Sequence, residues 1–182
     1  HSFLMRCFLE RVDGLLQGAC FPFREGFGSG SLAVQFAPDA SLYIGGTNRG
    51  WGSRGSQPFT FERVRFKGVV PFEMHDISAR PDGFEVTFTH PVDAATAGDV
   101  ASYALDTFIY IYQSSYGSPE VDGTKPTIKS ATVAPDGLSV RVVVDGLHEG
   151  HVHEFHLPGV RSAQGQPLVH DAAYYTLNQI PR

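Results

Sequence analysis

Short runs of alternating apolar and polar residues recur along the chain, and most of them end at glycine, proline or aspartate. Such alternation places successive side chains on opposite faces of a β-strand. No long segment carries apolar residues at helical spacing, and only residues 94–99 suggest a helical turn. The pattern therefore predicts an all-β protein, with strands at residues 6–11, 15–21, 31–36, 41–45, 59–66, 84–89, 108–112, 127–133, 139–144, 152–157 and 174–177.

The clearest alternation lies in the second half of the chain. Residues 84–88 alternate strictly and a proline follows shortly after, which suggests an edge strand of a β-sandwich. The same pattern returns in residues 138–144 and 153–157, each bounded by turn residues. Short strands at this spacing predict an immunoglobulin-like β-sandwich over residues 69–182.

The first part of the chain has a different pattern of strands and loops. Residues 41–55, SLYIGGTNRGWGSRG, read as a short strand that runs into a glycine-rich loop with Asn48, Arg49 and Trp51. A strand followed by such a polar loop is typical of a β-propeller blade. We therefore expect residues 1–68 to form a small antiparallel blade-like sheet packed on the sandwich.

Two stretches of the sequence carry a resemblance to a known family. The first is ACFPFREGFGSGSLAVQFAPDASLYIGGTNRGWGSRG followed by PFTFERVRFKGVVPFEM, which resembles the last blade of large extracellular propeller proteins similar to PQQ-dependent sugar (glucose/sorbosone) dehydrogenases. The second, from PDGFEVTFTHPVDAAT to LPGVRSAQGQPLVHDAAYYTLNQIP, resembles the immunoglobulin-like domain that closes such chains. That family builds its cofactor site from several blades, so the resemblance implies no quinone-binding or catalytic residue here.

The two cysteines flank a predicted hairpin. The dipeptide Asp13-Gly14 favours a two-residue type I′ turn, which needs positive φ at both positions. Pairing outward from this turn places Cys7 opposite Cys20 at a non-hydrogen-bonded position, where cross-strand Cα atoms are about 4.5 Å apart. A disulfide fits this geometry, and two free thiols in the core are the alternative.

Histidines gather near the C-terminal end. His151 and His153 share one face of a predicted strand, and their spacing suits two ligands of one metal ion. His153 also alternates with apolar residues, which favours a hydrogen-bonded core histidine over a ligand. His148 and His156 are expected to be solvated.

His1 suggests a copper site. An N-terminal histidine offers its α-amino nitrogen and its imidazole to one metal ion, and with a second histidine it would resemble the copper brace of lytic polysaccharide monooxygenases and some periplasmic copper carriers. The tail of the chain is similar to the end of those carriers, but Gln166 stands where their copper-binding histidine is expected. A copper-dependent oxidative enzyme acting on polysaccharide is thus an alternative, and no cofactor is expected otherwise.

Aromatic residues suggest a binding surface. Four aromatic residues could stack on sugar rings, because such side chains offer flat apolar faces with polar edges: Tyr110, Tyr112, Tyr116 and Trp51. The alternative is that tyrosines 110 and 112 fill the sandwich interior and that Trp51 packs the blade-like strands onto it. The expected polar complement is Asn48, Arg49, Gln113, Glu120 and Asp122.

Charge and composition narrow the function. The net charge of −5, with scattered basic residues, gives no reason to expect nucleic acid or an anionic membrane as partner. No apolar run approaches the roughly 20 residues that span a bilayer. We therefore expect a secreted or periplasmic noncatalytic module that binds carbohydrate or a protein partner. A further alternative is a structural fragment of a larger propeller protein, which would associate through unpaired blade edges.

Overall fold

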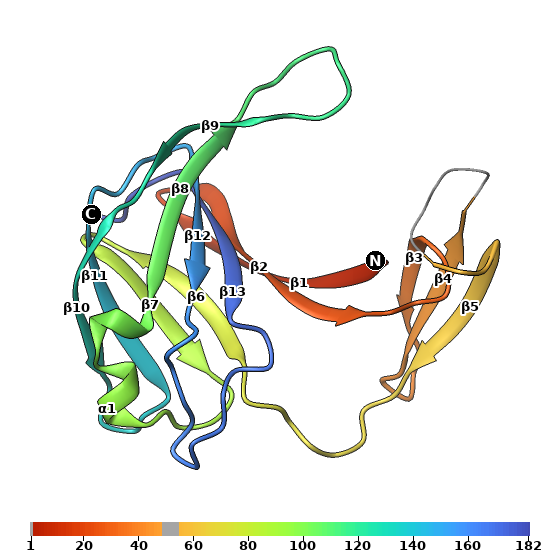
Figure 1. Ribbon diagram of the computed structural model, residues 1–182, viewed down its shortest axis with the longest axis horizontal. Coiled ribbons are helices and arrows are strands. Elements are labelled where there is room, and N and C mark those ends of the chain that lie inside the picture. Colours follow the sequence, from red (N-terminus) through yellow and green to blue (C-terminus); the bar gives the residue numbers. More distant parts are fainter. Residues whose placement is uncertain (1, 49–54) are drawn as a thin grey trace. The chain divides into compact units, whose positions relative to one another are not determined.

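The computed structural model describes residues 2–48 and 55–182, and its regular secondary structure consists almost entirely of antiparallel β-strands (Figure 1). This confirms the all-β fold class. The strands are β1 Phe3–Val12, β2 Leu15–Glu25, β3 Ser31–Phe36, β4 Leu42–Thr47, β5 Phe59–Val64, β6 Met74–Arg80, β7 Gly83–Phe88, β8 Ala104–Tyr110, β9 Glu120–Thr124, β10 Thr127–Val133, β11 Ser139–Asp145, β12 His151–His156 and β13 Ala172–Leu177, and the helical segments are α1 Ala94–Ala97 and the 3-10 helix η1 Val100–Ser102.

The chain divides into two compact units. The small unit comprises His1–Arg6 and Pro22–Val70, and the sandwich unit comprises Cys7–Phe21 and Pro71–Arg182. The sequence assigns residues 7–21 to the blade-like unit, whereas the structure places them in the sandwich. The reason is that β2 pairs with β13 through residues 18–20, so this part of the hairpin extends a sandwich sheet.

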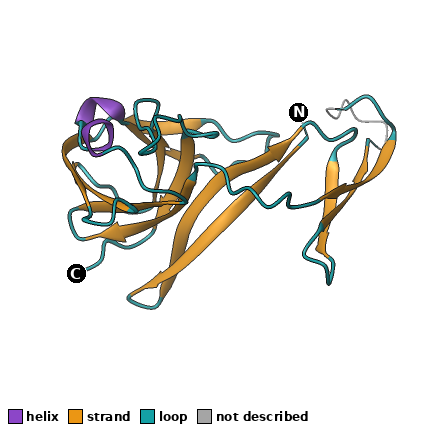
Figure 2. Ribbon diagram, turned by 90° about the horizontal axis from the view of Figure 1, so that it is seen from below, coloured by secondary structure: helices purple, strands orange, loops and turns teal. Residues whose placement is uncertain are grey.

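Two sheets form the sandwich unit. A six-stranded sheet has the order β1-β2-β13-β12-β8-β9, and a four-stranded sheet has the order β10-β11-β7-β6. Apart from Leu138, which is exposed, the alternating residues predicted to point inward are buried between them, and the helical turns α1 and η1 lie at one end (Figure 2). The largest fully buried side chains of this core include Tyr175, Phe84, Phe155, Met74, Ile77, Leu157 and Leu177.

The position of β7 differs from the sequence-based expectation. The alternation suggests an edge strand, but β7 lies between β11 and β6 in the four-stranded sheet. Strand β6, which the pattern does not reveal, pairs with β7 and takes the edge position. Strand β9, at the edge of the other sheet, is likewise unpredicted.

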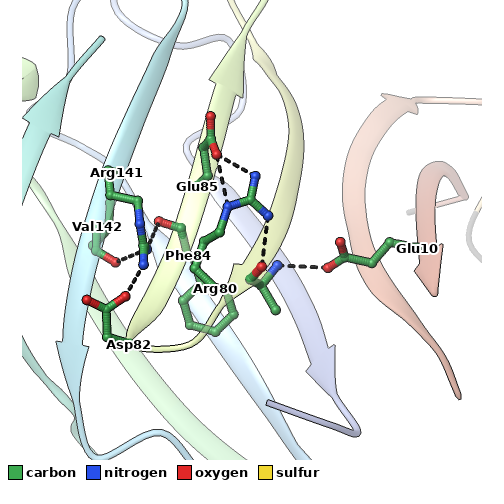
Figure 3. Close-up of polar contacts among 8 residues, drawn as sticks. Glu10, Arg80, Asp82, Phe84, Glu85, Arg141 and Val142 are labelled. Atoms are coloured by element: carbon green, nitrogen blue, oxygen red, sulfur yellow. Dashed lines mark hydrogen bonds and ion pairs between the residues drawn. The ribbon is translucent and has the colours of Figure 1, made fainter. Parts of the chain in front are cut away.

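Glu10 on β1 fastens the hairpin to the sandwich core. Its carboxylate accepts a hydrogen bond of 2.7 Å from the backbone N–H of Ala79 on β6, and another from the buried Tyr175 hydroxyl. Figure 3 shows Glu10 reaching the backbone of β6, next to the ion pair of Arg80 with Glu85. One carboxylate thus satisfies a backbone donor of an edge strand and a buried hydroxyl, both of which are costly to leave unpaired.

The small unit is a three-stranded sheet in the order β3-β4-β5. Its buried cluster consists of Phe27, Leu42 and Ile44, with Leu4 and Val64 packed against them. A core of this size is at the lower limit for an independently stable sheet.

Candidate interaction surfaces

One face of the three-stranded sheet carries a row of aromatic rings. The pairing of β4 with β5 sets Gly45 opposite Phe61 and Tyr43 opposite Arg63, so these residues alternate onto the face that turns away from Leu42 and Ile44. The rings of Tyr43 and Phe61 stack at 5.2 Å and 18°, and Phe59 follows two residues earlier on β5. We call Tyr43, Phe59, Phe61 and Arg63 the aromatic face.

The aromatic face is open to solvent. Phe59 and Phe61 are 75% and 76% exposed, whereas large apolar side chains that belong to a core are mostly buried. Gly45 adds no side chain beside Phe61, and an added Cβ there would meet only the Ala33 side chain, at 4.0 Å. The face is therefore flat as well as apolar.

A small polar network holds the arginine of this face in place. The guanidinium of Arg63 lies 5.4 Å from the centre of the Tyr43 ring, and it pairs with the carboxylate of Asp39. The Ser41 hydroxyl accepts from Arg63 Nε at 3.0 Å and donates to Asp39 at 2.6 Å. Hydrogen bonds from Ser41, together with the charge of Arg63, lower the pKa of Asp39 to about 2. Asp39 therefore stays ionised and neutralises the arginine at the edge of the aromatic row.

The predicted glycine-rich loop is described only at its start. Asn48 follows β4, is partly buried, and donates its backbone N–H to the Pro58 carbonyl at 2.9 Å. Arg49 and Trp51 lie outside the described residues. Their expected role in binding stays a prediction.

The predicted tyrosines lie on the loop between β8 and β9, which reaches out from the sandwich unit (Figure 1). Tyr112 and Tyr116 are fully exposed. The loop is closed by its own hydrogen bonds, because Gln113 Nε2 donates to the Gly117 carbonyl at 2.7 Å. Tyr110 is also half exposed, so neither it nor Tyr112 fills the sandwich interior.

Two of the three histidines predicted to bind a metal, His151 and His153, lie within the described residues. His151 is buried and its Nε2 lies 3.2 Å from the carboxylate of Asp122. His153 is a core residue as the alternation indicates, but the expected hydrogen bond is missing: neither ring nitrogen has a partner. Among the described residues no group of three or more His, Cys, Asp or Glu side chains could hold a metal ion, and His1 lies outside them. The expectation of copper bound by His1, His151 and His153 thus stays untested at its central residue.

The cysteines lie together as the hairpin predicts. Their sulfurs are 3.3 Å apart as free thiols, with Cys7 exposed and Cys20 partly buried. Asp13 and Gly14 have φ values of 47° and 88°, which agrees with the predicted type I′ turn.

No helix within the described residues has the length and apolar character needed to cross a membrane.

The aromatic face was not predicted from the sequence. The signal that could have revealed it is that apolar residues occupy both sides of these strands, with leucine and isoleucine of β4 on one side and phenylalanines of β5 on the other. Strands that are apolar on both sides are typical of sheets covered on both faces.

No protein-family model matches the chain, and no curated protein matches it. Solved structures of a bacterial surface-layer protein are similar to part of it. They are the S-layer protein rSbsC, with 23% identity and a TM-score of 0.46 over 60% of this chain, and the N-terminal part of SbsC, with 22% identity and a TM-score of 0.45 over 62%. The matched region makes up 14% and 25% of those longer chains, and the TM-scores are too low for the likeness to bear on function.

Proposed function

We propose that the chain is a noncatalytic β module, working outside the cytoplasm, that binds a protein partner through the aromatic face of its small unit. The partner surface is an apolar β-sheet. The observation that carries this proposal is the row of Phe59 and Phe61, each about three quarters exposed, beside the stacked ring of Tyr43.

Sheet packing explains why a β-sheet fits this surface. Two sheets that pack face to face interdigitate their side chains over a separation of about 10 Å, which suits a flat row of rings flanked by a glycine. The Asp39–Arg63 pair leaves no net charge at the edge of the row. An uncharged aromatic surface favours an apolar counterpart over an acidic or basic one.

The resemblance to propeller proteins points to the same partner. Neighbouring blades of a propeller cover one another's faces, so a blade-like sheet derived from such a protein would retain apolar residues on both sides. The opposite face of the small unit has this character too, since Phe36 and Val34 are exposed beside its small core.

Site-directed photocrosslinking tests the proposal. We expect a benzophenone side chain at position 61 to crosslink, in the source organism, to peptides from apolar β-strands of another polypeptide. Val169, which is 56% exposed in the sandwich unit, is the matched control position. A Phe61→Ser variant should lose the complex while keeping its circular dichroism spectrum. If position 61 crosslinks no more than position 169, the aromatic face is not a protein-binding surface.

Carbohydrate binding is the second candidate, favoured by the full exposure of Tyr112 and Tyr116 on one loop. Exposed tyrosines are suited to stacking on sugar rings. The wild-type chain should be retarded in polysaccharide affinity gels without added metal, and Tyr112→Ala and Tyr116→Ala should remove that retardation. Equal mobility of wild type and both variants in every gel would exclude this function for the loop.

A further inference from the structure

Beyond the cysteines the β1–β2 hairpin has no third strand of the six-stranded sheet beside it, and this part of it belongs to the small unit, where Leu4 packs against the buried cluster. Strand β2 pairs with β13 only from Gly18 to Cys20, and β1 is the edge strand of the six-stranded sheet. Residues 22–25 therefore have β1 as their only neighbour in this sheet. A ribbon of two strands is at best marginally stable by itself.

The cysteine pair stands where this ribbon begins. Cys7 is the first residue of β1 that belongs to the sandwich unit, and Cys20 is the last residue of β2 that pairs with β13. The two sulfurs are 3.3 Å apart, and side-chain rotation has to bring them closer by roughly 1.3 Å to reach a disulfide bond length. Residues on facing strands of a hairpin meet the geometric requirements of a disulfide.

We propose that Cys7 and Cys20 form a disulfide that clamps the ribbon at its base, and that a low-molecular-weight disulfide forms it by exchange through Cys7. The thiolate of Cys7 attacks one sulfur of the small disulfide and releases one small thiol. Cys20 then attacks the Cys7 sulfur, its proton passes to solvent, and a second small thiol leaves. Two protein thiols are thus oxidised while one small disulfide is reduced to two thiols.

Exposure assigns the order of the two steps. Cys7 is open to solvent, whereas Cys20 is partly buried against the sheet. Burial and the neighbouring Cys7 raise the pKa of Cys20 to about 11, so few Cys20 thiolates exist at neutral pH. Cys20 therefore reacts after Cys7 has brought a disulfide sulfur into contact with it.

Thiol trapping tests the clamp directly. The reduced full chain is incubated with oxidised glutathione, quenched with an alkylating reagent and weighed intact. The wild type should lose both alkylatable thiols without retaining glutathione. Cys20→Ser should stop at one glutathione adduct on Cys7, and Cys7→Ser should remain largely alkylatable. Two free thiols in the wild type under excess oxidant would overturn the disulfide, and equal adduct formation in both variants would overturn the order.

Hydrogen exchange tests the role assigned to the bond. Amides of residues 3–6 and 23–25 should exchange more slowly in the oxidised wild type than in the reduced one, while the β7 and β11 amides stay unchanged. A Cys7→Ser/Cys20→Ser double variant should resemble the reduced protein under both conditions. Equal exchange of the ribbon in oxidised and reduced wild type would show that the disulfide does not act as a clamp.

Discussion

Replacing His153 by leucine should stabilise the sandwich unit, and more so in acid. The imidazole is 0% exposed, neither of its nitrogens has a hydrogen-bond partner, and its ring lies 5.3 Å from that of Phe84. Each buried polar atom left unpaired costs about 1–3 kcal/mol. Leucine has a similar volume and no polar atoms, so we expect His153→Leu to raise the free energy of unfolding at pH 7 by about 1–2 kcal/mol.

The pH dependence follows from the pKa of the buried ring. Burial, with a smaller contribution from His151 and His148, lowers the pKa of His153 from 6.5 to about 4. Between these two values the unfolded chain binds a proton that the folded chain does not. His153 therefore leaves stability unchanged above about pH 7, lowers it as the pH falls through 6.5, and adds no further loss below 4. At pH 4.5 the loss amounts to about 2.5 kcal/mol.

Urea unfolding at pH 7 and pH 4.5, followed by amide exchange of the β7, β11 and β12 peptides, reports on the sandwich unit alone. The stability difference between His153→Leu and wild type should be larger at pH 4.5 by about 2.5 kcal/mol. His75→Gln is the control, because that side chain is 65% exposed and should change stability by less than about 0.5 kcal/mol. The same difference at both pH values would refute the reasoning that a neutral buried imidazole resists protonation.

Two further changes test how the sandwich unit is held together, both by urea unfolding. Glu10→Ala should lower the free energy of unfolding by about 2–3 kcal/mol, because the Tyr175 hydroxyl and a β6 backbone donor lose their acceptor. Glu10→Gln keeps an acceptor and should lower the free energy of unfolding by less. An equal loss in both variants would contradict the role of Glu10 as acceptor. Gly83→Ala should destabilise by about 3 kcal/mol, since φ is +154° and an added Cβ would lie 2.0 Å from a β11 carbonyl oxygen. At Gly123 an added Cβ has its nearest contact at 3.8 Å, so Gly123→Ala should be nearly neutral, and similar losses at both glycines would refute the steric argument.

The sandwich strands could be predicted where alternation is unbroken. The runs that became β7, β11 and β12 keep a strict period of two, and their inward residues are all buried. Strand β6 was not predicted, because a register shift between Met74 and Asp76 interrupts its alternation. A bulge of this kind moves the later side chains to the other face, so the pattern no longer reads as one strand.

Side-chain environment proved harder to predict than strand position. The alternation correctly places His153 in the core, but its missing hydrogen bonds depend on what the facing strands provide. Likewise, Tyr110 lies at the end of β8 beside a register shift in the β8–β9 pairing, and it is half exposed where the pattern allowed an interior position. Contacts between strands distant in sequence decide both cases, and local periodicity carries no information about them.

The aromatic face can be recognised by comparing the apolar sides of the strands in the two units. In β7 and β11 of the sandwich unit, the alternating apolar residues lie on one side, and that side is buried. In the small unit, β4 and β5 together are apolar on both sides; among the described residues, Leu42 and Ile44 are buried on one side, whereas Phe59 and Phe61 are exposed on the other. Exposing Phe59 and Phe61 forgoes the roughly 1.5–3 kcal/mol that burying each such side chain would contribute. Covering these side chains with a β-sheet of a partner would gain this free energy on binding. That gain is the physical basis of the proposed function.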